Sequence, residues 1–554
     1  MTNEGVPKTG WLRQVLGHRK IVELCGIDLR ALAALRITLA VIVLLDLAHR
    51  APDIPTLYGG EGVLPLEAVE ATSLHTLNGS VVFVAMLFVL HGLCAVMMLV
   101  GYHTWLGNAL TWFLLVSLHM RNMSVNNSGD HLLTLLLFWG LFLPLGARAS
   151  LDSRLARPRT PVARTVVGVA TVALMLQILY PYVFSAIAKS YEVWVTEGLA
   201  IYNALSLDVY TKPAGRLLLR WPRLVEAMSP VTYWFELFGP FLAFVPFLTP
   251  WFRGITALLF IGFHVSLQFS FELSVFAWVC MAMWLVFLPP SFWDKLAEWR
   301  PAAEFARCLG ALFDRVARRL EATVREQPWL APPADDARLT APGHVLAGVV
   351  GAYLLAWNVG NSWEPAQMPK ALRWPGEQLY IGQKWEMFGR PLIEDGWWIM
   401  PAQLEDGTEV DLFTEAPVHW DKPESVIESF PDRHWHRYLE GTWLNEDLRP
   451  RLAHFADWLR RRWDSRHAPE RQVKAMEIYY ALELTRPDYK PPARSDQLIY
   501  SWSGGGQERI VTRRESVVAL SRDLARDPAL ISDVQRALGA DASQPLTDPS
   551  SHSH

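Results

Sequence analysis

Residues 176–189 read LQILYPYVFSAIAK and close an apolar run that begins near Val166. The run is long enough to cross a bilayer as an α-helix, and aromatic residues gather in its last turns, as they do at membrane interfaces. It ends at Lys189, and the carboxylate nearest to that lysine in the sequence belongs to Glu192. The stretch therefore predicts a membrane-spanning helix with a single cationic side chain at its end.

Two interpretations of Lys189 stay open at this point. Apolar surroundings disfavour a charged ammonium because it loses its hydration, and a neutral amine can serve as a base. Alternatively, the long side chain reaches water at the interface and only marks the membrane boundary. The choice depends on which other polar residues lie at the same level of the membrane.

The composition indicates a membrane-embedded half followed by an aqueous half. The chain has 554 residues, of which 51% are hydrophobic, and 25 tryptophans, yet it also contains long polar stretches. A net charge of −4 gives no electrostatic basis for binding nucleic acid. The four cysteines are too far apart in sequence for a zinc-type spacing, and none follows Cys308, so disulfides do not hold the C-terminal part.

Apolar runs predict about nine transmembrane helices. The first is interpreted as an anchored helix and not as a cleaved signal, because Arg36 and Asp46 lie inside it and no small-residue cleavage site follows. The predicted spans are residues 31–48, 80–101, 105–120, 131–147, 165–188, 230–249, 254–271, 273–290 and 343–359.

Loop charges predict the orientation. The loop 51–79 has four acidic residues and no lysine or arginine, whereas the loop 148–164 has five arginines. By the positive-inside rule the N-terminus is cytoplasmic and the C-terminal part external, in a multi-pass membrane protein. Loop 190–229 is an exception: it should be external but contains four basic residues, which we expect to lie on the membrane surface or dock on the protein. Lys189 then lies at the external face.

The expected fold class is a polytopic α-helical membrane protein with a C-terminal extramembrane α+β or β-rich domain. Residues 300–326 predict an amphipathic interfacial helix, residues 379–388 and 397–413 a β-hairpin, and residues 473–485 a further strand. A helical stripe is predicted from Leu452, Phe455, Trp458, Leu459 and Trp463. The expected organisation is a cytoplasmic segment 1–28, a helix bundle 29–295, a cytoplasmic amphipathic connector 296–342, a last transmembrane helix 343–360, an external domain 361–540 and a disordered tail 541–554.

Polar residues inside apolar spans need a reason, because they are costly in a bilayer. Asp46 and Arg50 are four residues apart and are predicted to pair on one helix face. A larger set is predicted to gather in the external half of the bundle, where converging ionisable groups indicate a functional site and interhelix hydrogen bonds are the structural alternative. This set is Asn126, Asn127, His131, Lys189, Glu236, His264 and Glu272.

Several pieces of the first half form a recognisable series. They are residues 36–50 (RITLAVIVLLDLAHR), residues 58–65 (YGGEGVLP), Asn126-Asn127, residues 177–194, Phe263-His264, and FLPP at 287–290 with Trp293. In order and spacing the series resembles the HTTM family, the membrane domain shared with vitamin K-dependent gamma-carboxylases. The resemblance covers roughly residues 25–295. The second half, with QKWEMF at 383–388 and DGW at 395–397, is similar to the extension of bacterial HTTM proteins and unlike the carboxylases' substrate-binding region. This similarity implies a location in the bacterial inner membrane.

The resemblance implies a role for Lys189. In the carboxylases a lysine five residues before a tryptophan deprotonates reduced vitamin K, and oxygen then converts the quinol into a strong base that removes a glutamate γ-proton so that CO₂ can add. Lys189 and Trp194 keep that spacing. The carboxylases have a histidine directly after the paired asparagines, where this sequence has Ser128, and His131 follows three residues later. The expected catalytic residues are Lys189 and His131, the expected substrate-binding residues are Asn126, Asn127, Trp194, Glu236, His264 and Glu272, and the expected cofactor is a reduced, vitamin K-like quinone.

Three classes of function are compared. The first is a lipid-quinol-linked enzyme, either a gamma-carboxylase-like lyase or an oxidoreductase. The second is a non-catalytic membrane scaffold or protein-maturation factor whose external domain binds a protein or peptide partner, and whose bundle binds lipid or quinone. A transporter is disfavoured because the polar residues gather at one membrane level. His434 and His436 would share a face of an expected strand, but two histidines without a third ligand do not make a metal site, so no metal is expected.

Overall fold

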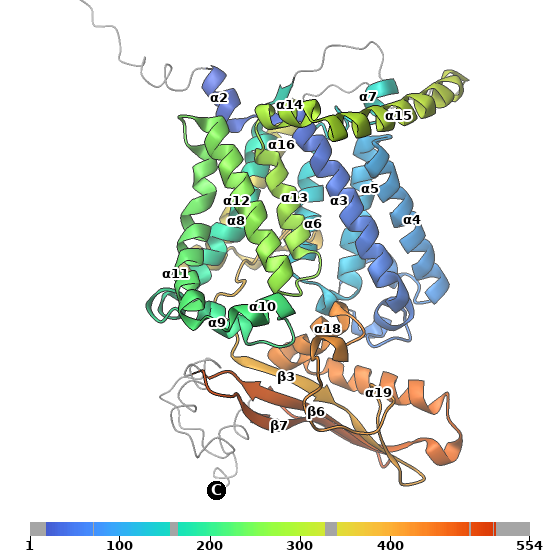
Figure 1. Cartoon of the computed structure of the whole chain (residues 1–554). Helices are drawn as coiled ribbons and strands as arrows, with labels where there is room; N and C mark the ends of the chain where they lie inside the picture. Colours follow the sequence, from blue (N-terminus) through green and yellow to red (C-terminus); the bar gives the residue numbers. More distant parts are fainter. Residues whose placement is uncertain are drawn as a thin grey trace, which may run out of the picture.

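The computed structural model describes residues 18–69, 71–155, 164–326, 341–486, 489–513 and 515–516. The predicted tail 541–554, the start of the N-terminal segment and residues 327–340 of the connector lie outside these ranges. The described chain forms a helix bundle with a β-rich region at one end (Figure 1).

The helices of the bundle run side by side, alternately up and down (Figure 1). Five of the described helices are long and apolar enough to cross a membrane, and the one that contains residues 176–188 is among them. A sixth is added if the bent pair Phe276–Phe287 and Pro290–Glu298 is one span. In chain order the bundle consists of α3 (Leu29–Arg50), α4 (Val81–Val100), α5 (Thr104–Arg121), α6 (Ser128–Gly140), α8 (Val169–Ala188), α11 (Pro222–Phe238), α12 (Thr249–Ser270), α13 (Phe276–Trp284) and α16 (Ala341–Ser362).

The expectation of about nine full spans is not confirmed for the described residues. Helices α5, α6, α11 and α13 occupy the other four predicted positions but are too short or insufficiently apolar to qualify alone. Helix α6 has 13 residues and is therefore roughly 20 Å long, against ~30 Å for a hydrocarbon core. Apolar runs in the sequence continue past these helix ends into short turns, such as Gly239–Phe244 after α11, which hydropathy alone does not separate from helix.

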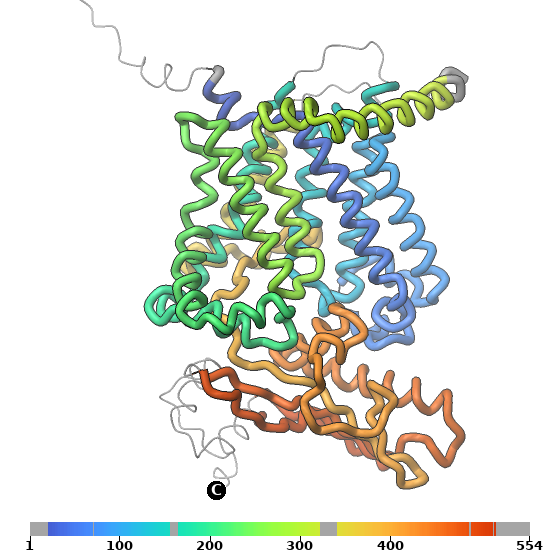
Figure 2. Tube along the Cα trace, in the orientation of Figure 1, coloured from blue at the N-terminus to red at the C-terminus, as the bar shows by residue number. Residues whose placement is uncertain are grey.

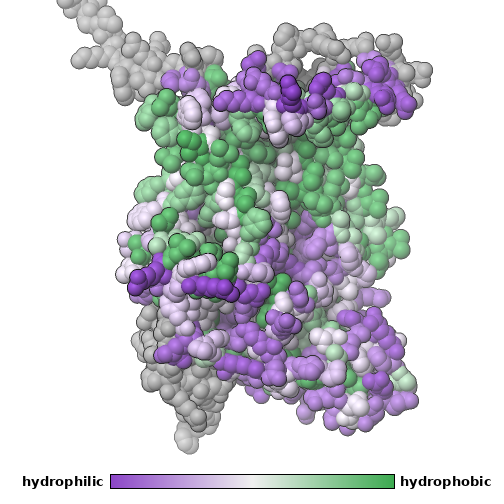
Figure 3. Space-filling view, in the orientation of Figure 1, coloured by the Kyte–Doolittle hydropathy of each residue, from purple (hydrophilic) through white to green (hydrophobic). Residues whose placement is uncertain are grey.

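The outer surface of the bundle is suited to lipid. Figure 3 shows an apolar belt across the visible face of the bundle, between two polar ends. Large hydrophobic side chains on three of the long helices are strongly exposed, among them Val82, Val89 and Leu93 of α4, Trp251 and Leu258 of α12, and Val345 and Val349 of α16. Such a continuous apolar surface has no function in water and indicates a membrane environment.

Short elements cover the two ends of the bundle. At the end away from the β-rich region lie α2 (His18–Cys25), α7 (Asp152–Leu155), α14 (Pro290–Glu298), α15 (Arg300–Glu326) and the two-stranded pair β1 (Ile27–Asp28) and β2 (Thr165–Val166). The predicted helix at 300–326 is confirmed as α15, which lies across this end (Figure 1). At the other end lie α9 (Ala200–Leu205) and α10 (Pro213–Leu218).

The C-terminal region contains an antiparallel sheet of six strands. Their order is β5-β4-β6-β7-β8, and β3 pairs with the remaining part of the long strand β6. The strand predicted at 473–485 is confirmed, as is the helical stripe, whose five side chains are all buried on α19. The elements are α17 (Lys370–Gln378), β3 (Glu394–Ile399), β4 (Pro401–Leu404), β5 (Glu409–Asp411), α18 (Arg433–Leu444), α19 (Arg451–Asp464), β6 (Val473–Leu484), β7 (Ala493–Ser503) and β8 (Gln507–Ile510).

The predicted hairpin is correct only around the turn at Asp406-Gly407, which joins β4 to β5. Residues 379–388 form no strand. Residues 380–390, called the inserted segment below, enter the bundle, where the side chains of Gln383 and Gln177 of α8 hydrogen-bond reciprocally at 2.7 and 3.0 Å. Figure 2 shows this part of the trace among the helices. Irregular backbone is tolerated at membrane depth where protein groups satisfy it, and here Trp357 Nε1 donates to the Gln383 carbonyl at 2.9 Å.

Helix α18 joins the sheet to the bundle. Trp435 Nε1 donates to Asp53 Oδ1 at 2.9 Å, and the Tyr438 hydroxyl donates to the Val63 carbonyl at 3.1 Å. The expectation that His434 and His436 share a face of a strand is wrong, because both belong to this helix, where residues two apart point to different sides.

Candidate functional site

Lys189 is the C-cap residue of α8 and is buried, with a side chain only 1% exposed. Its Nζ donates to Glu236 Oε2 at 2.5 Å and to Ser185 Oγ at 2.9 Å, and it lies 3.5 Å from the Met387 carbonyl. The interpretation that this lysine only marks the water interface is therefore not supported by its packing. Its counterion comes from 47 residues further along the chain, on α11.

Trp194 completes the surroundings of the lysine. The ammonium nitrogen lies 4.8 Å from the centre of the indole ring, a cation–π distance. The indole Nε1 donates to the Phe388 carbonyl at 2.9 Å, which fixes the ring against the inserted segment. The five-residue spacing of Lys189 and Trp194 thus brings their side chains together through the π-helical turn Glu192–Thr196.

A hydrogen-bonded chain lies on the same face of α8, since Tyr182 precedes Lys189 by two helical turns. Trp284 Nε1 donates to the Tyr182 hydroxyl at 2.8 Å, and that hydroxyl lies 2.7 Å from His264 Nε2. The hydroxyl therefore accepts from the indole of Trp284 and also has the imidazole of His264 as a hydrogen-bond partner. The other ring nitrogen of His264, Nδ1, is buried without a hydrogen-bond partner.

Asn126, Asn127 and His131 form a second cluster around the start of α6. Asn127 is the N-cap of α6 in a reciprocal capping box with Asp130. Asn126 Nδ2 donates to the His119 carbonyl at 2.8 Å and to the Tyr380 hydroxyl at 3.2 Å, while its Oδ1 is buried without a partner. The asparagine pair therefore has a structural role that the sequence interpretation did not anticipate, with one amide oxygen left available.

The predicted pair of Asp46 and Arg50 is confirmed and is part of a larger buried network. Arg50 Nε donates to Asp46 Oδ2 at 2.8 Å, Nη1 to the Tyr58 hydroxyl at 2.7 Å and Nη2 to Asp130 Oδ1 at 2.6 Å. The carboxylates of Asp46 and Asp130 also lie near His119 in a group that could hold a metal ion. The guanidinium already occupies the position of a cation between these carboxylates, so the group needs no metal.

Glu272 does not belong to either cluster. It pairs with Lys212 at 2.8 Å, and both side chains are partly exposed. Glu272 was expected to gather with His264, but the chain leaves α12 at Ser270 and Glu272 turns toward the loop. Lys212 belongs to the basic loop 190–229, whose basic residues were expected either to lie on the membrane surface or to dock on the protein. Lys212 docks on the protein.

The inserted segment connects the two clusters. Its Tyr380 and Trp385 rings lie 5.0 and 6.0 Å, centre to centre, from the ring of His131. Its Met387 and Phe388 carbonyls contact Lys189 and Trp194, as described above. The sequence interpretation missed this arrangement, and it also missed Ser185, although the i, i+4 spacing of Ser185 and Lys189 was a readable signal.

Two cavities border the inserted segment. One, of about 340 Å³, is lined by Asn127, His131, Trp357, Tyr380 and Trp385, among others. The other, of about 410 Å³, lies between the ends of α8 and α16 and is lined by Phe184, Ala188, Asn358, Trp385 and Gly389, among others. His131 Nε2 is buried without a hydrogen-bond partner, so it has a free position for a ligand.

The arrangement can move a proton without separating charge. A protonated Lys189 beside an ionised Glu236 is neutral overall, and transfer of the proton to Glu236 keeps the pair neutral while leaving a free amine. Aromatic walls and a free imidazole nitrogen nearby suit a flat, hydrogen-bonding molecule.

Comparison with known proteins identifies the first half of the chain. Residues 26–293 match the family model described as HTTM domain. No curated protein and no solved structure matches the chain.

Proposed function

We propose, given that residues 26–293 form an HTTM domain, that the bundle binds a lipid-soluble quinol and that Lys189 removes a proton from it. The observation that carries the proposal is the buried pair of Lys189 and Glu236 at the end of α8, in contact with a segment from the C-terminal region. In the orientation that the loop charges predict, this pair lies at the external face of the membrane.

The proposed chemistry starts with the proton moving from Lys189 to Glu236. The free amine then accepts a hydroxyl proton of the quinol, which gives an ammonium beside a quinolate anion. The nitrogen of Lys189 lies over the face of Trp194, so the positive charge that forms again on the lysine has a stabilising partner.

The proposed binding place is the cavity of about 340 Å³ beside His131. Its aromatic residues Trp357, Tyr380 and Trp385 offer faces for stacking, and the free His131 Nε2 offers a hydrogen bond to a quinol oxygen. The inserted segment separates this cavity from Lys189, so the proposal requires the segment to move before the proton is transferred.

Two reactions follow from a quinolate, and the assay separates them. Consumption of oxygen and quinol alone indicates an oxidoreductase, whereas incorporation of CO₂ into a glutamate-containing peptide indicates a gamma-carboxylase-like lyase. In either case membrane quinone is the bundle's ligand, and the C-terminal region presents or gates the second substrate.

The test uses full-length protein in detergent micelles with a reduced naphthoquinone, measuring oxygen uptake and labelled CO₂ fixation. Lys189→Met should reduce turnover by at least about 100-fold, the low end of what a positioned base contributes. Glu236→Gln should reduce it as well, because no carboxylate remains to take the lysine proton. Lys212→Met is the matched control, since Lys212 also pairs with a carboxylate but lies outside the site. Equal turnover of Lys189→Met and the control would refute the proposed base.

A scaffold that binds a protein or peptide partner is the second candidate, and a cleft favours it. The cleft has a volume of about 900 Å³ and lies between the loop 53–81 of the bundle and the C-terminal region. Asp53, Glu61 and Glu67 line one side, and Arg462 and Arg466 line the other. Tight peptide binding by the wild type and by Lys189→Met alike, with no quinol turnover by the wild type, would support this candidate over the enzyme.

A further inference from the structure

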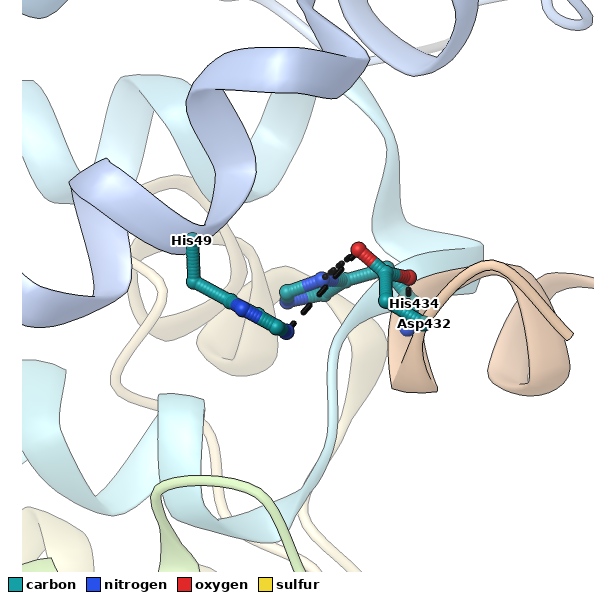
Figure 4. Close-up of side chains that lie close together, drawn as sticks. All are labelled: His49, Asp432 and His434. Atoms are coloured by element: carbon teal, nitrogen blue, oxygen red, sulfur yellow. Dashed lines mark hydrogen bonds and ion pairs between the residues drawn. The ribbon is translucent and has the colours of Figure 1, made fainter. Parts of the chain in front are cut away.

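We propose that His49, Asp432 and His434 form a binding site for a divalent transition metal, with Zn²⁺ as the ion whose coordination preference the three ligands fit best. The site is independent of the proposed quinol chemistry. It joins the end of α3 to the start of α18 and so connects the bundle to the C-terminal region (Figure 4).

The geometry fits a small metal ion. One ligand atom from each of the three residues lies within 4.8 Å of the others. Asp432 Oδ2 lies 3.4 Å from His434 Nδ1 and 3.9 Å from His49 Nε2. Ligands at the ~2.0–2.2 Å distances of zinc are roughly 3.4 Å apart in a tetrahedron, a separation that Asp432 and His434 already have. The half-exposed His49 has to move toward both of them to complete the set.

The surrounding contacts hold two of the ligands in place. Asp432 is the N-cap of α18, and its Oδ1 accepts from the backbone N–H groups of His434 at 2.8 Å and Trp435 at 3.1 Å. The other oxygen, Oδ2, faces the two histidines. The His434 side chain is held by burial, since it is only 2% exposed.

Local charge also favours a cation. The carboxyl of Asp53 hydrogen-bonds to that of Asp432, so the two acids share a proton and one negative charge remains beside the two imidazoles. Two histidines and one carboxylate with an open fourth position are a common ligand set for zinc. Pro431 and Trp435, on either side of the Asp432–His434 turn, line the cleft of about 900 Å³, so the fourth position lies close to that cleft.

The test measures metal binding to tag-free, full-length protein in detergent after treatment with a chelator. We expect one equivalent of Zn²⁺ or Co²⁺ per chain, with a visible Co²⁺ spectrum of a low-coordinate site. His49→Ala and Asp432→Asn should each weaken binding by more than about tenfold, since even loss of an outer-shell partner costs that much. Asp432→Asn retains a side-chain oxygen for the helix cap and so tests the ligand separately from the fold.

His454→Ala and His436→Ala are the controls. His454 is exposed on α19, and the His436 ring contacts Tyr210 and Phe430 on another side of α18, so both variants should keep the metal. Absence of stoichiometric binding to the wild type, or full binding in His49→Ala, would overturn the proposal. Loss of the metal in His436→Ala with retention in His49→Ala would instead assign it to the pair His434 and His436.

Discussion

Replacement of Arg50 by methionine gives the sharpest test of how the bundle is held together. Arg50 is fully buried and joins the carboxylates of Asp46 and Asp130, whose side chains are 1% and 0% exposed. The variant leaves two buried carboxylates without their cation. Removal of one partner of a buried ion pair costs ~3–5 kcal/mol, which is roughly two to four orders of magnitude in the folding equilibrium constant.

Asp130→Asn should be considerably milder. With both aspartates ionised the triad carries one net negative charge, and this substitution makes it neutral. Asparagine also keeps an oxygen that can accept from the Asn127 N–H, a bond of 2.7 Å in the wild type. The loss is then mainly that of one charge-assisted hydrogen bond, about 1.5–3 kcal/mol. In the double variant the two costs should not add, because the second substitution removes a charge that the first left unpaired, and a coupling of about 1–3 kcal/mol is expected.

The assay is unfolding in mixed detergent micelles with increasing SDS, followed by tryptophan fluorescence. Arg36→Met is the matched control: Arg36 is on the same helix and equally buried, but its Nε and Nη1 have no hydrogen-bond partner and its Nη2 donates only to the Ala149 carbonyl. Its replacement should cost less than that of Arg50, because no buried carboxylate loses its partner. Equal costs for the two arginines, or simple additivity of Arg50→Met and Asp130→Asn, would refute the reasoning.

Two further predictions concern the inserted segment and pH. A Cβ at Gly382 would lie 2.3 Å from Trp357 Cζ2, so Gly382→Ala should lower the free energy of unfolding by about 1–3 kcal/mol and speed proteolysis after α16. The control is Gly262→Ala, which should be neutral or stabilising because a Cβ there meets nothing within 4 Å. Equal proteolysis rates for the two variants would contradict this reasoning. Burial and the nearby charge of Asp208 raise the pKa of Asp395 to about 7 from 3.8, so the folded state binds this proton more tightly than the unfolded state does. Its stabilising effect is complete below about pH 4 and is lost, by up to about 1.4 kcal/mol per pH unit, as the pH rises to about 7. Asp395→Asn should remove that slope from melting curves recorded between pH 4 and 8, and an unchanged slope would exclude Asp395 as its source.

Local sequence patterns predicted a substantial part of the fold. Hydropathy located a helix at every predicted span, although only five are long and apolar enough to cross a membrane alone. Periodicity found α15, α19 and β6, and the i, i+4 rule found the pair of Asp46 and Arg50. These features depend on neighbours within about two helical turns, which is the range over which a single sequence carries information.

The candidate site was predicted only in part. Lys189, Trp194, Glu236 and His264 gather around one end of α8, but Asn126, Asn127 and His131 form a separate cluster and Glu272 belongs to neither. Their common membrane level could be inferred from the topology, but their rotation about each helix axis could not. The prediction for 379–388 failed because an alternating pattern of apolar and polar residues describes a strand and also a segment whose polar groups are satisfied by surrounding helices.

The sequence by itself determined which segments are helical and apolar, where the aqueous half begins, and that Lys189 ends a membrane helix, because these properties follow from local composition and periodicity. Only the tertiary structure decided which side chains from distant parts of the chain contact one another. Glu236 meets Lys189 across 47 residues, Gln383 meets Gln177 across 206, and His49 of the bundle faces His434 of the C-terminal region. Such pairings result from how helices pack and rotate against one another, and no local pattern of residues specifies them.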